Sequence, residues 1–462
     1  MRWQVAVPSI LFVLVILAPV VYRQCRLAQV PGIGDPFSVS GILKPISEEE
    51  NAFPLFKEAL ALRKKMTDAD SKEYWDEGRD GWDPTDNQLN KYLKMNRPAL
   101  EKWREATDKE NYQITPIAKL SEPPYITKIQ ASRDLVRWCQ LEIEHLTKTG
   151  KSAEALPWLL ASFRCSGLIT RSAPGLDRMM GADYFAFSAG STEKWMQHPD
   201  VTRDELLDLL SVVQTSARLM EKPSTTVKVN YLVSRQEYAK WSYDAMKDSY
   251  EELGILEGIP GFDIDPPLGS KLETWLLAEP EFSRLLVAHL TANLLVFVDN
   301  FRRDRPPLID GYIFDESAVG VMPAGHLPAH RLIDVLKDSK LIDADTASLL
   351  DFIDCEQVRR VCLQVALAAQ TYYRDRGEFP DRLADLRPDY LSSLPDDDDP
   401  YAPQPMIYRR TDDEAVVYSR FTNEIDDGGT TVTYGEARPE ELRDFGFRIR
   451  RPRNLPVVAP RP

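Results

Sequence analysis

The sequence lacks the short motifs that carry the chemistry of many common enzymes. It contains no GxSxG, no HExxH, no P-loop and no GxGxxG that opens a helix. Its five cysteines form neither a CxxC pair nor a dense framework. Cys355 and Cys362 lie seven residues apart on a predicted helix, hence about 10 Å apart, which is too far for a disulfide and indicates buried thiols. The catalytic residues are therefore unknown, and the sequence favours a protein that is not an enzyme.

An excess of positive charge is also missing. The 57 lysine and arginine residues are outnumbered by 72 aspartate and glutamate residues, which gives a formal net charge of −15. Such a charge opposes the phosphate backbone, so nucleic acid is not an expected partner. The chain nevertheless has 462 residues, of which 43% are apolar. It can bury a large core, and its length suggests about two to four domains.

Long hydrophobic runs are scarce, and only one is long enough to cross a membrane. Val5 to Tyr22 is a run of uncharged, mostly apolar residues, about the minimum for a transmembrane helix. We interpret it as an uncleaved anchor, with a cleaved signal peptide as the alternative. A second run, Leu285 to Val298, is shorter and contains polar residues, so it predicts a buried helix. His289, within that run, is expected to be a core histidine.

Most of the chain after the anchor shows helical periodicity. The clearest feature is a helical hairpin joined at Gly150, whose second helix resembles a tetratricopeptide unit, although no 34-residue repeat follows. Before it, the stretch around Pro98 predicts two short helices separated near that proline. Ser47 to Glu50 has the pattern of a capping box at the start of an amphipathic helix. Further helices are expected at about 203–218, 226–250, 270–304 and 330–352.

The pattern changes near the carboxy terminus. A helix predicted from Glu356 ends at Gly377 and leads into a proline-rich acidic loop. Two strand-like runs follow, "PMIYRR" and "AVVYSRF", separated by the polar turn "TDDE". The sequence therefore predicts a small α+β unit that contains a helix and a short antiparallel β-hairpin.

The segments "YYRDRGEFPDRLADL", "LPDDDDPYAPQPMIY" and "VVYSRFTNEIDDGG" resemble the carboxy-terminal half of type II secretion major pseudopilins. The resemblance covers roughly Glu356 to Thr430, and a similar module is familiar from membrane-anchored bacterial proteins that join it to a long helical region. The resemblance implies that the Asp/Gly turn can hold calcium through Asn423, Asp426 and Asp427. Arg420 and the residue after it replace the glycine of the family pattern, and the amino terminus lacks the pseudopilin signal.

The aspartate run Asp396 to Asp399 is expected to be an exposed polar turn, because prolines flank it and adjacent carboxylates repel. Its neighbours are expected to pack instead. Pro380, Leu383, Leu386, Tyr390 and Leu394 should cover the preceding helix.

Two other pairs have the spacing of metal ligands. His326 and His330 lie four residues apart, but Pro328 between them favours a loop. Glu142 and His145 have the spacing found on a di-iron helix, yet no second copy completes a carboxylate cage. Neither pair is predicted to bind a metal, so calcium is the only ion that the sequence suggests.

Together these patterns predict a mainly α fold: a helical-hairpin array with a small C-terminal α+β module, preceded by one transmembrane helix. The predicted divisions are an anchor (1–26), a helical domain with TPR-like hairpins (27–354), a pseudopilin-like module (355–435) and an Arg/Pro-rich, poorly ordered tail (436–462).

The predicted function is that of a non-catalytic interaction or scaffold module anchored in the cell envelope. Its expected partners are the membrane, through the N-terminal helix, and a protein on the helical surface. We expect a single-pass inner-membrane protein with most of its chain outside the cytoplasm, although Arg2, Arg23 and Arg26 leave the orientation open. Two alternatives stay open: an envelope hydrolase that uses a carboxylate pair, and an accessory component of a secretion or pilus-like system.

Overall fold

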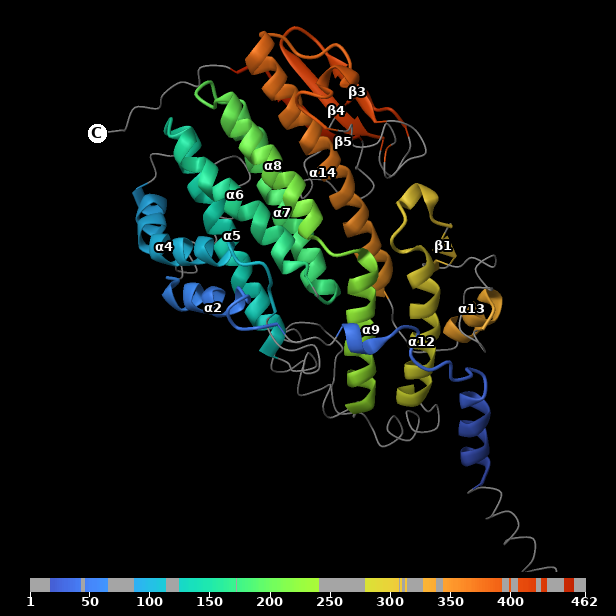
Figure 1. Ribbon diagram of the computed structural model, residues 1–462. Helices are drawn as coiled ribbons and strands as arrows, with labels where there is room; N and C mark the ends of the chain where they lie inside the picture. Colours follow the sequence, from blue (N-terminus) through green and yellow to red (C-terminus); the bar gives the residue numbers. More distant parts are fainter. Residues whose placement is uncertain are drawn as a thin grey trace, which may run out of the picture.

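The fold is mainly helical, with a small antiparallel sheet near the carboxy terminus, as the sequence predicts (Figure 1). The computed structural model describes residues 17–42, 46–64, 87–113, 124–171, 173–240, 279–306, 308–309, 312–313, 327–337, 344–392, 399, 406–420, 425–429 and 444–452. The helices are α2 (Phe53–Leu62), α4 (Asn87–Ala106), α5 (Pro124–Lys148), α6 (Ser152–Ile169), α7 (Gly175–Met196), α8 (Arg203–Leu219), α9 (Pro223–Lys240), α12 (Glu279–Phe297), α13 (Ala329–Lys337) and α14 (Ala344–Arg376). Single 3-10 turns lie at Val39–Gly41, Arg302–Asp304 and Leu383–Leu386.

The predicted helical hairpin is confirmed. Helices α5 and α6 are joined at Gly150, whose φ of 75° is the left-handed conformation that glycine adopts most easily. Helices α6 and α7 then approach so closely that a Cβ on Gly181 would overlap the Cγ2 atom of Thr170. Small residues at this contact let the helix backbones meet. The hairpin therefore continues into a tightly packed array.

Two helix predictions are wrong. Helix α4 is one helix that contains Pro98, rather than two helices separated near it. Proline removes one backbone hydrogen bond, and the packing of Leu93 and Leu100 in the core outweighs that loss. Helix α14 runs without a break across the predicted gap between residues 352 and 356. Residues 344–376 contain neither proline nor glycine, so nothing in the chain ends the helix before Gly377.

The predicted β-hairpin is confirmed and belongs to a three-stranded sheet in the order β3-β4-β5. Its strands are β3 (Ile407–Arg410), β4 (Glu414–Ser419) and β5 (Phe445–Arg450). A two-stranded pair, β1 (Leu308–Ile309) and β2 (Tyr312–Ile313), lies elsewhere. Strand β5 lies in the predicted tail, so the expectation of poor order is wrong for its residues. Its alternate side chains Phe445, Phe447 and Ile449 are buried, which explains why the strand packs on α14.

The acidic loop differs in part from its prediction. Asp399 is only 1% exposed and its carbonyl accepts a hydrogen bond from Arg303 at 3.1 Å, so the expectation of an exposed turn is wrong for this residue. Residues 393–398 lie outside the described part of the chain. The predicted packing of the preceding segment is confirmed: Leu386 is fully buried and Tyr390 is nearly so, both in the main core. Leu394 is not among the described residues.

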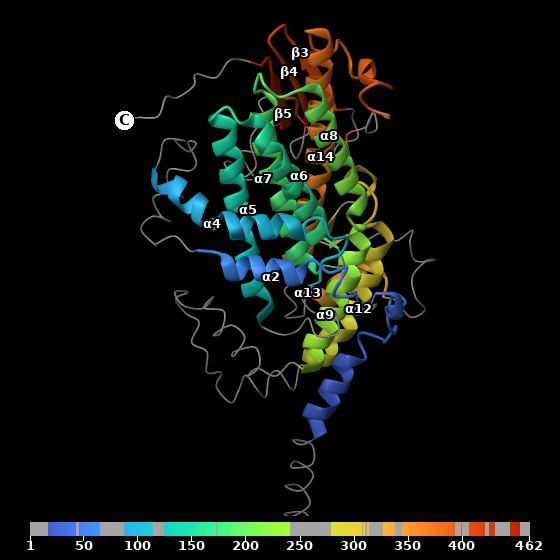
Figure 2. The same ribbon diagram turned by 60° about the vertical axis from the view of Figure 1, so that its left-hand side comes forward.

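We call the packed helices α2–α14 and the sheet the body. At the other end of the chain, residues 17–27 form a helix that extends from the lower end of the body in both views (Figure 1, Figure 2). In the described part of the chain, no helix has the length and apolar character needed to cross a membrane. Most of the predicted anchor, up to residue 16, is not among the described residues.

Candidate functional site

The middle of α14 carries an unusual concentration of buried charge. Within the segment "DCEQVRR", Asp354, Glu356, Arg359 and Arg360 are each at most 7% exposed. An α-helix places residues four apart on one face, so Glu356 and Arg360 point the same way, whereas Arg359 lies about 100° around the helix. The charges therefore face several neighbouring elements, and buried charges require partners.

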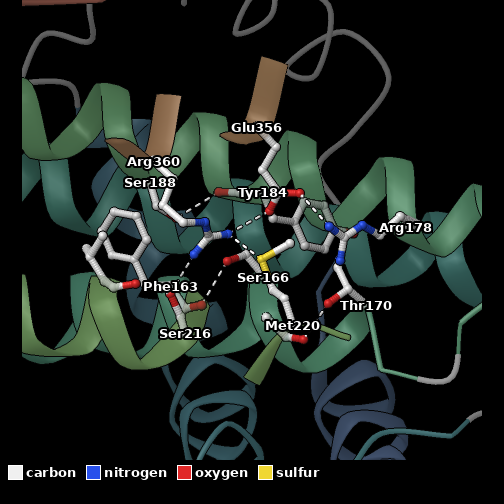
Figure 3. Close-up of polar contacts among 12 residues, drawn as sticks. Phe163, Ser166, Thr170, Arg178, Tyr184, Ser188, Ser216, Met220, Glu356 and Arg360 are labelled. Carbon is white, nitrogen blue, oxygen red and sulfur yellow. Dashed lines mark hydrogen bonds and ion pairs between the residues drawn. The ribbon is translucent and has the colours of Figure 1, made fainter. Parts of the chain in front are cut away.

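Glu356 lies between two arginines (Figure 3). Its Oε1 atom accepts a hydrogen bond from Nη2 of Arg360 at 2.7 Å, and its Oε2 atom lies 3.2 Å from Nη2 of Arg178, which belongs to α7. The side chains of Glu356 and Arg178 are 1% and 4% exposed. We call Arg178, Glu356 and Arg360 the buried triad. It joins α14 to α7 by charge in a region that is shielded from bulk solvent.

The rest of the Arg360 guanidinium contacts α7 and α8. Its Nη1 atom donates to Oγ of Ser216 at 3.1 Å, Nη2 contacts the sulfur of Met220, and the group lies 4.3 Å from the centre of the Phe185 ring. Burial lowers the pKa of Arg360, although the Glu356 carboxylate opposes that shift. The guanidinium is therefore held on several sides by protein atoms, and it acts as a packing group as well as a charge.

Arg178 is less fully engaged. Its Nε and Nη1 atoms are buried and have no hydrogen-bond partner among the described residues. These two atoms lie on different edges of the planar guanidinium, with Nη2 between them. One ligand group could not accept from both unless it displaced Glu356.

Four hydroxyl groups around the triad have partners in the backbone. A serine nucleophile needs a base to accept its proton. Here each hydroxyl donates instead to a backbone carbonyl of its own helix, three or four residues earlier, at 2.7–2.9 Å. These residues are Ser166, Thr170, Ser188 and Ser216 (Figure 3).

Other faces of α14 carry further buried contacts. Nη1 of Arg305, which follows α12, lies 2.9 Å from both carboxylate oxygens of Asp354. Burial raises the pKa of Asp354 to about 6, although Arg305 opposes the shift. On another face, the Arg359 guanidinium lies 4.7 Å from the centre of the Phe445 ring in β5. Charged residues of one helix thus contact the α7–α8 pair, the segment after α12, and the sheet.

Two of the predicted calcium residues, Asp426 and Asp427, lie in the described part of the segment between β4 and β5. Asp426 accepts hydrogen bonds from the Tyr418 hydroxyl at 2.9 Å, the Gly428 amide at 3.0 Å and the Arg409 guanidinium at 2.6 Å. Burial would raise the pKa of Asp426, but these donors together lower it. Asp427 lies beside it, and Asn423 is outside the described residues.

Asp444, which the sequence interpretation missed, accepts from the Gly429 amide at 2.7 Å. Within the described residues no group of three or more histidine, cysteine, aspartate or glutamate side chains could hold a metal ion. The described donors to Asp426 and Asp444 are protein groups that fix the turn. Calcium at this turn stays a prediction.

The remaining candidate residues have structural partners. His289 is fully buried; its Nε2 atom lies 2.8 Å from the Pro31 carbonyl, and its Nδ1 atom accepts from the Leu327 amide, as expected of a core histidine. Glu142 is buried and paired with Arg97, and burial raises its pKa. His330 is exposed near the start of α13, and His326 is not described. Cys355 and Cys362 are buried free thiols, as predicted.

Sequence reasoning missed the buried triad altogether. Its members come from α7 and α14, far apart in the chain, and a glutamate four residues before an arginine also occurs on exposed helices. The only local signal is that Glu356, Arg359 and Arg360 stand directly before the mostly apolar stretch of residues 361–369.

No family model, curated protein or solved structure matches this chain. The resemblance to pseudopilins therefore stays a prediction from the quoted motifs.

Proposed function

We propose that this protein is a membrane-anchored envelope protein that serves as a non-catalytic interaction or scaffold module. The observation that carries the proposal is the helix formed by residues 17–27. It continues the apolar run of the amino terminus and leaves large apolar side chains exposed: Leu17 is 49% exposed, Val20 42%, Val21 57% and Tyr22 52%. Side chains of this kind, gathered at the end of a predicted span, suit a lipid environment.

The scaffold part of the proposal rests on the body. Packed helices of the kind seen in α5–α8 offer extended surfaces to protein partners, which is how TPR-like arrays work. The three-stranded sheet packs against α14, whose buried charges contact neighbouring elements. The body is thereby suited to hold a fixed shape while a partner binds its surface.

Three of the buried carboxyl groups give the hydrolase alternative no support. Glycoside hydrolysis needs two carboxyl groups that face each other across a cleft. The buried carboxyl groups of Glu142, Glu356 and Asp354 instead each face an arginine. This pairing is typical of structural roles.

Membrane fractionation of the full chain tests the proposal. The wild-type protein should sediment with membranes and require detergent for release. Val13→Arg places a charge near the middle of the predicted span, at a cost of about 2.5–3.5 kcal/mol, and should shift the protein toward the soluble fraction. Leu62→Arg alters an exposed leucine of the body and is the matched control. A wild-type protein that stays soluble, or a Val13→Arg protein that sediments like the wild type, contradicts the proposal.

Protease treatment of spheroplasts tests the location. If the body lies outside the cytoplasm, the carboxy-terminal module should be digested before the inner membrane is lysed. Digestion only after lysis would reverse the orientation.

A further inference from the structure

The end of the predicted span is joined directly to the helical body. Arg23 follows Tyr22, the last residue of the apolar run, and its Nη2 atom lies 2.5 Å from Oε1 of Glu281. Three residues later, the Arg26 guanidinium lies 4.2 Å from the centre of the Phe282 ring. Glu281 and Phe282 both belong to the first turn of α12. No free linker therefore separates the predicted span from this helix.

The next residues hold the chain against the same helices. Val30 is 1% exposed and packs in a small core with residues of α12 and α13. The Pro31 carbonyl lies 2.8 Å from Nε2 of His289 in α12. Asp35 accepts hydrogen bonds from Tyr231 at 2.7 Å and Arg235 at 2.6 Å, both in α9. Residues 23–35 thus form a strap that fixes the anchor to α9 and α12.

Resting on the proposed membrane attachment, we infer that the first turn of α12 lies in the headgroup layer and contacts lipid phosphates. The headgroup layer is roughly 5–8 Å thick on each side of the hydrocarbon core. Arg23 to Arg26 span about 5 Å along a helix, so their contacts on α12 fall within this layer. Tyrosine and arginine at the end of a span are typical of such interfaces.

One exposed side chain next to this turn, in the second turn of α12, suits the phosphate groups of lipids. Arg284 is exposed on α12, two residues after Phe282. A guanidinium can bind a phosphate through two parallel hydrogen bonds. The three-stranded sheet lies at the opposite end of the body, far from the strap in both views (Figure 1, Figure 2). In this orientation, the end of the body that carries the first turn of α12 faces the bilayer, and the sheet points away from it.

Fluorescence quenching in vesicles of phosphatidylcholine and phosphatidylglycerol tests this orientation. The full chain carries Cys25→Ser, because Cys25 is the exposed cysteine and the other four are buried. A fluorophore is attached at Arg284→Cys or, as the control, at Asp412→Cys in the exposed β3–β4 turn. A nitroxide on the lipid headgroup should quench the label at residue 284 several-fold more than the label at residue 412.

The contact between Arg23 and Glu281 gives a second test on the same label. Arg23→Glu should reduce quenching at residue 284, and the exchange Arg23→Glu with Glu281→Arg should restore it, while the protein stays in the membrane fraction. Equal quenching at residues 284 and 412 in a membrane-bound protein overturns the inference and leaves the proposed function intact. A protein that does not sediment with membranes overturns both. If quenching at residue 284 is the same in Arg23→Glu as in the protein with the native Arg23, the ion pair does not fix the orientation.

Discussion

Removal of the Glu356 charge should destabilise the protein strongly. At an effective dielectric constant of about 20, two unit charges about 3 Å apart attract by roughly 5–6 kcal/mol. Glu356 makes two such contacts, at 2.7 Å and 3.2 Å, in a triad whose side chains are at most 9% exposed. Much of this attraction offsets the cost of burying three charges, which is several kcal/mol for each ion. Without the Glu356 carboxylate, Arg178 and Arg360 stay buried but lose the negative charge that they share.

We therefore expect Glu356→Gln to lower the free energy of unfolding by about 3–5 kcal/mol, measured by urea denaturation at neutral pH. Asp351→Asn is the matched control, because Asp351 lies on the same helix but is 62% exposed in its pair with Arg302. The control should cost less than about 1 kcal/mol. A loss below about 1 kcal/mol for Glu356→Gln would refute the reasoning, because it would mean that the triad is solvated.

A triple replacement separates burial from pairing. Arg178→Met, Glu356→Leu and Arg360→Met together remove every charge of the triad while roughly keeping side-chain volume. The triple variant should be about as stable as the wild type or more stable, because the cost of burying charge disappears with the attraction. A triple variant as unstable as Glu356→Gln would show that hydrogen bonds to groups outside the triad dominate.

Three further predictions concern other parts of the molecule. The pKa of Asp354 is raised to about 6 in the folded state from an ordinary 3.8. The folded state therefore binds this proton more tightly than the unfolded state does. The protonation of Asp354 contributes at most about 3 kcal/mol to stability at low pH, and this contribution is lost as pH rises from 4 to above 6. Asp354→Asn should remove that part of the pH dependence in urea unfolding curves, and an unchanged curve would contradict the burial argument. Leu386→Ala should lower the free energy of unfolding by about 2–5 kcal/mol, and Asp399→Ser should lower it by about 1–3 kcal/mol. Asp396→Ser should cost little. Equal losses of stability for the two aspartate variants in thermal melts would be inconsistent with the burial of Asp399. If calcium binds, it should raise the melting temperature relative to chelator in the wild type and in Asp396→Ser but not in Asp426→Ala, and no shift in the wild type ends that hypothesis.

Local patterns were sufficient to predict several elements. The α5–α6 hairpin follows from apolar periodicity and a glycine between the helices, and the β3–β4 hairpin follows from alternation around a polar turn. The turn closes as expected, with the Thr411 amide donating to the Glu414 carbonyl at 2.7 Å. Strand β5 has the same alternation in "FGFRIR", but its arginines and its place in an Arg/Pro-rich segment concealed it. Both the hits and this miss depend on signals within a few residues.

The candidate site could not be predicted in this way, because its geometry depends on tertiary contacts. Asp399 belongs to a run that is acidic in sequence, yet only tertiary packing decides that this one carboxylate is buried. The same holds for Arg178, whose partner lies on a distant helix. Sequence periodicity identifies which face of a helix is apolar, but it does not identify which charged residues share that face with an oppositely charged neighbour.

The continuity of α14 bears on how the protein is organised. The predicted division between the helical domain and the carboxy-terminal module, after residue 354, falls inside this helix. The first part of α14 contributes Leu350 to a small core with α9 and α12, its middle carries the triad, and its last part packs against the sheet. A single helix whose buried charges must all be matched cannot shift along its neighbours without separating those charges. Helix α14 therefore holds α7, α8 and the sheet in one arrangement, which suits the proposed scaffold.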